Sequence, residues 1–286
     1  MVITIIVVIY DKELIESSTL KSIYDSIDGN CNLVIVNNGP TSAMVNDIFY
    51  KKLERKFNVL DYYEFLDNKP LSILYNDMIK NYKSDYYIIL DDDSILGEDY
   101  ITEYNAIGQN DYDILTPRIR SVTDGCIYYP IENKRIINDK QEYLTGDVFS
   151  IGSGLIISQK FIAKIISNYG DFFDEKYAFY GVDMSIFRRI LLMKDKQMFQ
   201  IKAKGTIYHS LSRLDSSQSF FKSSERIIDA ALTLRNYYSF DNVLLFIKIS
   251  LKNIKYLGFF SVLQLSFKTI IDGIHPKNKL WSKFNG

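Results

Sequence analysis

Three consecutive carboxylates, Asp91-Asp92-Asp93, directly follow the apolar and aromatic run of residues 86–90. Such a run is typical of a strand buried on both faces, and buried strands rarely end in stacked negative charge without a partner. Acidic triplets also occur in solvated turns, but this position favours function. Carboxylate oxygens suit hard cations such as Mg²⁺ or Mn²⁺, which are often shared with phosphate groups. The triplet therefore predicts a metal and diphosphate site, with Asp93 as the first-choice ligand.

Asp91 and two later residues are further candidates for the same site. Asp91 would reach the metal through water or hold a sugar or ribose, whereas Asp92 can point away from it. His209 and Arg213 follow the last expected strand, where His209 could ligate the metal and Arg213 could clamp a diphosphate. Lone histidines are more often structural, so these two residues carry less weight than the triplet.

A second acidic candidate, Asp183, ends an aromatic-rich segment that starts at Phe172. Aromatic surroundings tend to raise the pKa of a carboxyl group and make it a competent general base. Asp is also favoured at helix N-caps, and a helix is expected over residues 184–192. The local sequence supports these two interpretations equally.

Two glycines in Gly152-Ser153-Gly154 lie within residues 148–158, which are expected to form a strand. Glycine inside a strand loses packing and usually indicates the close approach of a ligand or of another backbone. Ligand binding and a tight strand crossing explain the motif equally well.

The elements around these candidates are expected to alternate between strands and helices. Buried strands are predicted at residues 1–10, 33–36 and 86–90, a short strand at 58–60, and helices between them at 12–27, 43–55 and 71–81. This alternation is typical of a parallel, doubly wound sheet, whose ligands bind at the carboxyl ends of the strands. Further on, strands are expected at 113–117, 148–158 and 199–203, with a helix at about 159–167.

Composition narrows the class of protein. The 286 residues are 47% hydrophobic and 24% charged, enough for a substantial core in one large domain or two smaller ones. A formal net charge of −1 gives no support for a nucleic-acid partner. Cys31 and Cys126 are too few to staple this fold, so we expect free thiols in a reducing compartment. The apolar start lacks the features of a secretion signal, and no apolar run reaches the ~20 residues of a spanning helix.

The last part of the chain differs in character. From Asp241 onward, seven lysines and two aspartates give a local charge of +5. A basic amphipathic helix pair beside Trp281 suits an anionic membrane surface, and a helical hairpin packed on the body with solvated lysines explains the pattern equally well. Two apolar stripes at helical spacing, separated by Gly258, carry both interpretations: Leu244, Ile247, Leu251 and Ile254, then Leu263, Phe267, Ile270 and Ile274.

Taken in order, these features resemble the inverting family 2 glycosyltransferases of the GT-A fold, and among them a bacterial rhamnosyltransferase-like branch. Leu90-Asp91-Asp92-Asp93-Ser94 is similar to a Leu-Asp-Gln-Asp-Ser pattern, with Asp92 in place of the glutamine. The strand ending at Tyr10 and the turn Val36-Asn37-Asn38-Gly39 resemble the nucleoside-binding start of the family, although Asn37 stands where an aspartate is common.

The second half of the resemblance lies around Asp183. Phe173-Asp174-Glu175, followed by Gly181-Val182-Asp183 and Arg188, resembles the acceptor-side block of the family, with Val182 replacing the first member of the commoner Glu-Asp pair. Arg235-Asn236 also resembles a downstream pair of this branch. The resemblance covers about residues 1–236, and it rests on order and spacing because each short motif alone is a weak match.

The resemblance implies an α/β fold of the GT-A type, with a Rossmann-like nucleotide-binding half, a mixed central sheet and a C-terminal helical extension. The catalytic domain would span 1–210, with a nucleotide-sugar half at about 1–95 and an acceptor half at about 96–210, followed by a basic helical region at 211–286. Asp183 would be the catalytic base, and Asp93, Asp91 and His209 would hold Mn²⁺ or Mg²⁺. The implied donor-binding residues are Val8, Tyr10, Asn37, Asn38, Asn68, Asn76, Asp91, Asp92 and Arg213. The implied acceptor-side residues are Gly152, Ser153, Gly154 and Tyr180.

The activity implied is inverting transfer of a sugar, with rhamnose from dTDP-rhamnose favoured, to a hydroxyl of a growing bacterial surface glycan such as an O-antigen or capsule repeat unit. The acceptor would be linked to undecaprenyl diphosphate, and the enzyme would be peripheral on the cytoplasmic face of the cell membrane, with a homodimer as an option. A UDP-hexose or UDP-galactofuranose transferase stays open. A sugar-phosphate nucleotidyltransferase is disfavoured because residues 10–14 lack a glycine-rich phosphate loop. A non-enzymatic, membrane-associated assembly subunit is the remaining alternative.

Overall fold

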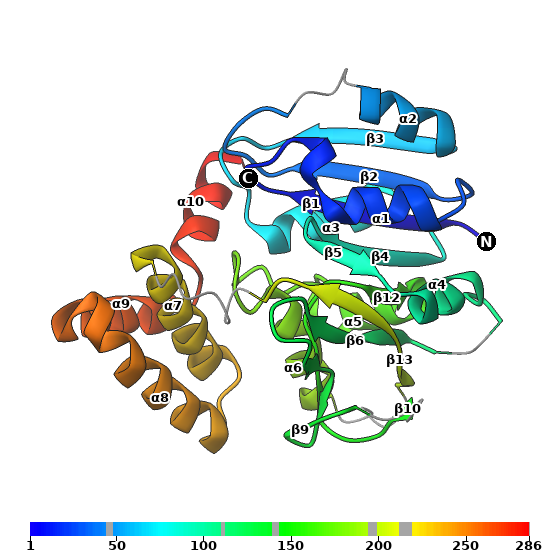
Figure 1. Ribbon diagram of the computed structural model, residues 1–286. Coiled ribbons are helices and arrows are strands. Elements are labelled where there is room, and N and C mark those ends of the chain that lie inside the picture. The colour runs from blue at the N-terminus through cyan, green and yellow to red at the C-terminus, as the bar shows by residue number, and fades with distance from the viewer. Residues whose placement is uncertain (44–47, 110–111, 139–142, 194–198, 212–218, 286) are drawn as a thin grey trace. The chain divides into compact units, whose positions relative to one another are not determined.

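The computed structural model describes residues 1–43, 48–109, 112–138, 143–193, 199–211 and 219–285 (Figure 1). The chain divides into two compact units. The first comprises residues 1–68, 78–172 and 189–211, and the second comprises residues 69–77, 173–188 and those from 212 onward. The predicted domain boundary near residue 210 adjoins residues outside the described ranges and stays a prediction.

Four parallel strands form one half of the main sheet in the first unit. They lie in the order β3 (Val59–Glu64), β2 (Asn32–Asn37), β1 (Ile3–Ile9) and β4 (Tyr86–Asp91). Every residue of β1 is buried, as expected for a strand that is covered on both faces. Val8 of β1 pairs with Asp91 and Ile9 pairs with Asn37, so the carboxyl ends of these strands lie at one edge of the sheet.

Antiparallel strands make the other half of this sheet mixed. β12 (Leu155–Ser158) lies antiparallel between β4 and β6 (Ile114–Ser121), and β13 (Ile201–His209) runs parallel to β6. The mixed central sheet implied by the resemblance is therefore confirmed, and the parallel sheet expected from the alternation describes its first half only. The smaller strands are β5 (Ser94–Leu96) and β10 (Tyr143–Leu144), which pair with β13, β7 (Ile127–Tyr129), which pairs with β6, and the separate sheet of β11 (Val148–Phe149), β8 (Ile131–Glu132) and β9 (Arg135–Ile136).

Two helices of the first unit, α1 and α5, begin where serine side chains cap them. The Ser17 side chain accepts a hydrogen bond from the Leu20 N–H, and Ser158 accepts one from the Phe161 N–H. The helices are α1 (Ser18–Ser26), α2 (Ile48–Lys56), α4 (Glu98–Asn105) and α5 (Gln159–Tyr169), with a short 3₁₀ helix at Leu14–Glu16. α3 (Leu71–Asn81) and α6 (Val182–Leu192) begin in the second unit and end in the first.

Helices dominate the second unit. They are α7 (Phe220–Asn236), α8 (Phe240–Leu257), α9 (Phe259–Asp272) and α10 (Pro276–Asn285). Ser219 caps α7 and Ser239 caps α8, while Gly258 makes the turn between α8 and α9. A small apolar core of Ile227, Leu257 and Val262 holds α7, α8 and α9 together. These three helices lie next to one another (Figure 1). Among the described helices, none combines the length and the apolar character needed to cross a membrane.

Several predicted elements are wrong in their bounds; the last strand, expected over 199–203, is β13 and extends from Ile201 to His209. Gly152-Ser153-Gly154 forms a turn rather than the middle of a strand, because Gly154 adopts φ +84°, which ends the extended backbone before β12. The helix expected over 12–27 divides at Ser17, whose extended backbone and capping side chain start α1. β6 continues past Pro117 because the register of β13 shifts opposite this residue, where proline cannot donate a hydrogen bond.

Candidate functional site

Two carboxylates and an imidazole converge at the carboxyl end of β4. β4 ends at Asp91, and the turn through Asp93 leads into β5, whose first residue, Ser94, pairs with His209 at the end of β13. One ligand atom from each of Asp91, Asp93 and His209 lies within 4.8 Å of the other two. The structure thus brings together the three residues that the sequence predicts as metal ligands, all from the first unit.

Charge and burial at this cluster favour a cation. The Asp93 Oδ1 atom lies 3.0 Å from His209 Nδ1, and the Asp91 Oδ2 atom lies 3.7 Å from His209 Nε2. Burial of the imidazole lowers the pKa of His209, but Asp93, Asp91 and Asp92 outweigh this effect and raise the pKa above its usual value. Two carboxylates and a histidine match the oxygen and nitrogen donors that hold Mn²⁺ or Mg²⁺ in proteins, so the residues fit the implied cofactor.

Three hydroxyl side chains form hydrogen bonds to the metal-ligand candidates or to the backbone beside them. Ser94 Oγ lies 3.0 Å from His209 Nδ1 and 2.6 Å from Ser153 Oγ. The Asp91 N–H donates to Ser153 Oγ at 3.3 Å. Thr19 Oγ1 donates to the Asp91 carbonyl at 2.5 Å and accepts from the Ser94 N–H at 2.7 Å. These contacts fix the backbone on both sides of the carboxylates. Sequence analysis missed Thr19.

The turn that contains Ser153 also packs closely against the neighbouring strands. A Cβ atom added at Gly154 would lie 2.6 Å from Ile207 Cδ1 and 2.8 Å from Pro117 Cγ. The Gly154 N–H donates to the Ile89 carbonyl at 2.7 Å. The structure therefore gives Gly154 a packing role, while the acceptor-side role of Gly152, Ser153 and Gly154 stays a prediction.

Asp92 turns away from the metal cluster. Its carboxylate accepts from Lys12 Nζ at 2.5 Å and from the Tyr10 N–H at 3.1 Å. The Asp92 carbonyl accepts from Ser17 Oγ at 2.9 Å. Asp92 thus ties the end of β4 to the segment after β1, and its inclusion in the donor-binding set stays a prediction. The Tyr10 side chain is exposed.

The asparagines at the end of β2 shape the turn there. Asn37 is fully buried, and its Nδ2 donates to Glu64 Oε1 at 3.1 Å and to the Thr41 carbonyl at 2.8 Å. Asn38 Nδ2 donates to Asn68 Oδ1 at 3.1 Å, and Asn68 adopts φ +55°. The structure thus brings Asn38 and Asn68 together and places Asn37 against Glu64, which the sequence analysis missed. Arg213 lies outside the described residues.

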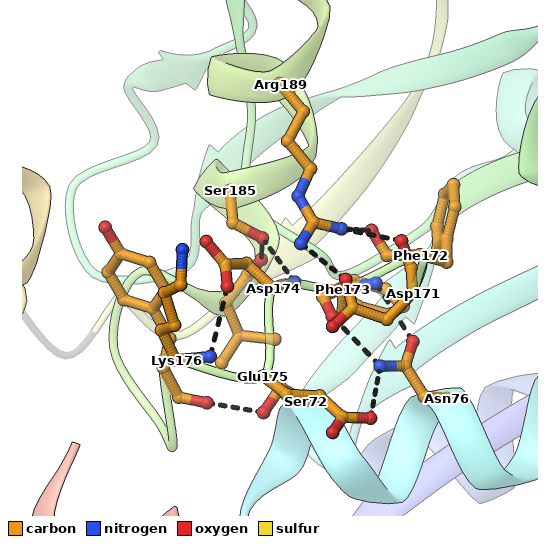
Figure 2. Close-up of polar contacts among 12 residues, drawn as sticks. Ser72, Asn76, Asp171, Phe172, Phe173, Asp174, Glu175, Lys176, Ser185 and Arg189 are labelled. Carbon is orange, nitrogen blue, oxygen red and sulfur yellow. Dashed lines mark hydrogen bonds and ion pairs between the residues drawn. The ribbon is translucent and has the colours of Figure 1, made fainter. Parts of the chain in front are cut away.

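Asn76 holds the backbone of the segment before α6. Its Oδ1 accepts from the Phe173 N–H at 2.9 Å, and its Nδ2 donates to the Phe173 carbonyl at 2.9 Å and to Glu175 Oε1 at 3.0 Å (Figure 2). Asp174 accepts from the Lys176 N–H at 3.1 Å. All of these residues belong to the second unit. Asn76 thus uses its amide for structure, and its predicted donor contact stays a prediction.

Asp183 occupies the first turn of α6. Because the Ser185 N–H donates to the Gly181 carbonyl at 2.9 Å, Gly181 is the N-cap, and the N-cap interpretation of Asp183 is wrong. Asp183 Oδ1 accepts from the Met184 N–H at 3.0 Å. Tyr180 lies in the turn before the helix. The carboxylate is partly exposed at a helix N-terminus, and its role as a base stays a prediction.

Arg188 pairs with Asp229, a carboxylate of α7. Arg188 Nη1 lies 3.7 Å from Asp229 Oδ1, and the guanidinium lies over the rings of Tyr177 and Tyr237, at 5.6 and 5.9 Å. Burial raises the pKa of Asp229, Arg188 opposes this shift, and the charge of Asp183 adds to it. The guanidinium of Arg188 is therefore the counter-ion of the Asp229 carboxylate. Sequence analysis missed Asp229.

Glycine at position 181 lets Asp229 approach α6. Gly181 adopts φ +81°, and a Cβ atom added there would lie 2.2 Å from Asp229 Oδ1. No side chain fits this space without displacing the carboxylate. The backbone at the start of α6 and the Asp229 carboxylate are therefore packed directly against each other.

Replacement of Arg188 by alanine is expected to lower the free energy of unfolding by about 2–3 kcal/mol, because it leaves the largely buried Asp229 without its counter-ion. Urea unfolding followed by circular dichroism measures this change. Arg235, an exposed arginine of the same helix as Asp229, provides the matched control. Arg235→Ala should stay within about 0.5 kcal/mol of the parent, and equal losses in both variants would contradict the buried role of Arg188.

No protein-family model and no curated protein sequence matches this chain. Solved structures do match. S. aureus TarS 1–349 in complex with UDP-GlcNAc is 12% identical, with a TM-score of 0.52 over 99% of this chain and 92% of that chain. GalNAc-T7 with UDP, GalNAc and Mn²⁺ is also 12% identical, with a TM-score of 0.57 over 95% of this chain and 54% of that chain. At such identities the likeness concerns the fold, and this chain has the GT-A fold of glycosyltransferases.

Proposed function

We propose that this protein is a metal-dependent, inverting glycosyltransferase that uses a nucleotide-sugar donor. The observation that carries the proposal is the convergence of Asp91, Asp93 and His209 at the carboxyl end of β4 in a GT-A sheet. Ligands of open α/β sheets bind at this edge. The two similar structures contain UDP-GlcNAc in one case and UDP with Mn²⁺ in the other, which supports a donor of this class.

In this mechanism, Asp91, Asp93 and His209 would hold a divalent cation at the place where the donor diphosphate binds. When bound, such a cation neutralises the negative charge that develops on the leaving nucleoside diphosphate. Thr19, Ser94 and Ser153 keep the ligands oriented before the donor arrives.

Asp183 would take the proton from the acceptor hydroxyl as that oxygen attacks the anomeric carbon. Attack from the face opposite the leaving group forms the new glycosidic bond as the bond to the diphosphate breaks, so one displacement inverts the configuration. The proton ends on the Asp183 carboxylate, and the departing nucleoside diphosphate carries the electron pair. Burial lowers the pKa of Arg188, but Asp229 and, more weakly, Asp183 help to raise it, so Arg188 and Asp183 interact electrostatically.

Two donor classes compete within this proposal. The resemblance in sequence favours dTDP-rhamnose and transfer to a lipid-linked bacterial surface glycan, with Gly152, Ser153, Gly154 and Tyr180 on the acceptor side. The nucleotide of the two similar structures instead favours a UDP-sugar. Asn37 stands at the end of β2, where this family commonly has an aspartate, and its amide is engaged within the turn. The choice between thymine and uracil is therefore a matter for direct measurement.

A thermal-shift panel of UDP, dTDP, UDP-hexoses and dTDP-rhamnose, with and without Mn²⁺, tests the proposal. A ligand at about 100 times its Kd stabilises a protein by about 2.7 kcal/mol, which corresponds to a rise in Tm of roughly 5 °C. We expect such a rise for one nucleotide class in the presence of Mn²⁺ only. If no nucleotide shifts the Tm under either condition, the site is not a donor site, and a non-enzymatic assembly role becomes the better explanation.

A further inference from the structure

The helical hairpin of α8 and α9 exposes its apolar side chains to solvent. Phe260 is 83% exposed, Phe267 is 69% exposed and Leu251 is 66% exposed. These side chains follow two helical stripes, and α7 packs against both helices, so the stripes lie on the sides that α7 leaves open. Further exposed members are Leu244, Leu245, Ile247, Tyr256, Phe259, Leu263 and Ile271.

Polar residues occupy part of the buried side of the same hairpin. Asn253 and Thr269 are each 1% exposed, and Ser266 is buried beside the small core of Leu257 and Val262. A helix pair that folds only to bury apolar surface would show the opposite distribution. Contiguous apolar surface left in water usually marks an interaction site. The hairpin is therefore built to meet an apolar partner on its outer face.

The charge of the hairpin identifies that partner. Between Val243 and Ile271 the chain carries four lysines and no acidic residue, and all four lysines are exposed: Lys248, Lys252, Lys255 and Lys268. A second copy of this face would bring eight such cations together against apolar contacts, which is unfavourable. An anionic bilayer offers apolar interior and negative headgroups at once.

The dimensions of the helices agree with this partner. α8 has 18 residues and α9 has 14, so they are about 27 and 21 Å long. Neither is suited to crossing a bilayer. Amphipathic helices of this kind lie in the plane of the interface, with the apolar face at the level of the first acyl carbons and the lysines at the headgroups.

We propose that the outer face of α8 and α9 binds the surface of an anionic lipid bilayer, with Phe260, Leu263 and Phe267 entering the interface and the four lysines contacting headgroup phosphates. This inference goes beyond the proposed function and does not depend on it, because it rests on the hairpin alone. It assigns the chain a membrane-binding surface that is separate from its metal cluster and from Asp183.

Flotation of the full chain with vesicles tests the proposal. The parent protein is expected to float with vesicles of phosphatidylcholine and phosphatidylglycerol in about equal parts, and to bind much less to phosphatidylcholine alone. Phe260→Asp combined with Phe267→Asp should weaken binding at least about tenfold, since each loses the free energy of a buried phenyl ring. Lys252→Glu combined with Lys255→Glu should weaken binding to the anionic vesicles, and added salt should do the same.

Ile48→Asp is the matched control, because Ile48 is 78% exposed on α2 in the first unit. This variant should float like the parent. Circular dichroism of each variant checks that the helices still form, and the substituted side chains are all exposed. Equal flotation of parent and hairpin variants would overturn the proposal, as would a parent that forms dimers broken by Phe260→Asp and does not float. The vesicles contain no nucleotide and no glycan, so the result of the flotation assay does not depend on whether the protein is a transferase.

Discussion

Asp183→Asn is expected to lower the kcat of sugar transfer by about 10²–10⁴-fold, the contribution of a positioned general base. Asparagine keeps the size of the side chain and can still accept from the Met184 N–H, so the start of α6 should be preserved. The amide cannot take the proton of the acceptor hydroxyl. Donor binding, measured by calorimetry with Mn²⁺ present, should stay within about threefold of the parent, because the metal cluster is untouched.

Asp241→Asn is the matched control for this variant. Asp241 also lies in the first turn of a helix, α8, and is exposed. Its replacement removes the same favourable interaction with a helix dipole, worth about 0.3–1 kcal/mol, without touching the proposed base. Turnover should therefore be unchanged with a soluble acceptor. If Asp183→Asn retained full turnover, Asp183 would not be the base.

Asp93→Ala is expected to weaken Mn²⁺-dependent donor binding at least about 100-fold. Loss of an outer contact to a metal ligand already costs 10–100-fold in affinity, and loss of a ligand itself should cost more. Transfer should fall with binding, since the diphosphate would lose its fixed counter-charge. Calorimetric titration of Mn²⁺ and nucleotide measures both effects. Asp91→Ala and His209→Ala should show the same direction.

Asp92→Asn tests whether the middle carboxylate of the triplet ligates the metal. The Asp92 carboxylate faces Lys12 and the Tyr10 N–H, so this variant should retain its Mn²⁺ dependence and lose stability instead. An amide can still accept from one of these donors, and the expected loss is about 1 kcal/mol. A collapse of Mn²⁺ binding in Asp92→Asn would show that the middle carboxylate holds the metal.

Local patterns in the sequence were sufficient for the elements that position the metal ligands. α3 was predicted at its observed bounds because apolar spacing and the preceding proline define it. β4 was recognised as a buried strand, and the position of Asp91 and Asp93 follows from its end. His209 was placed at the site through the resemblance and its position after the last strand, which the pairing of β5 with β13 now explains.

The supporting residues could not be predicted, because they meet only through distant pairings. Ser94 lies in β5 and Ser153 lies in the turn before β12, and their hydroxyl groups are within hydrogen-bond distance of each other. Serine residues follow no periodic pattern from which this contact could be predicted. Asp229 lies on α7 among residues that read as an ordinary amphipathic helix. Asn76 matched a family position, yet a single side chain in a helix says nothing about which backbone its amide will meet.

Asn278 of α10 has a consequence for any shortened form of this protein. Its Nδ2 lies within hydrogen-bond distance of the Glu175 and Tyr177 carbonyls, at 2.9 and 3.0 Å, and the His275 N–H donates to the Lys176 carbonyl at 2.8 Å. Hydrogen bonds from the end of the described chain thus hold the loop that leads to Asp183 in place. Removing the C-terminal helices would release this loop and disturb the base together with any lipid anchor. The proposed base and the proposed bilayer-binding surface therefore depend on the same helices, and point substitutions rather than truncations can tell their effects apart.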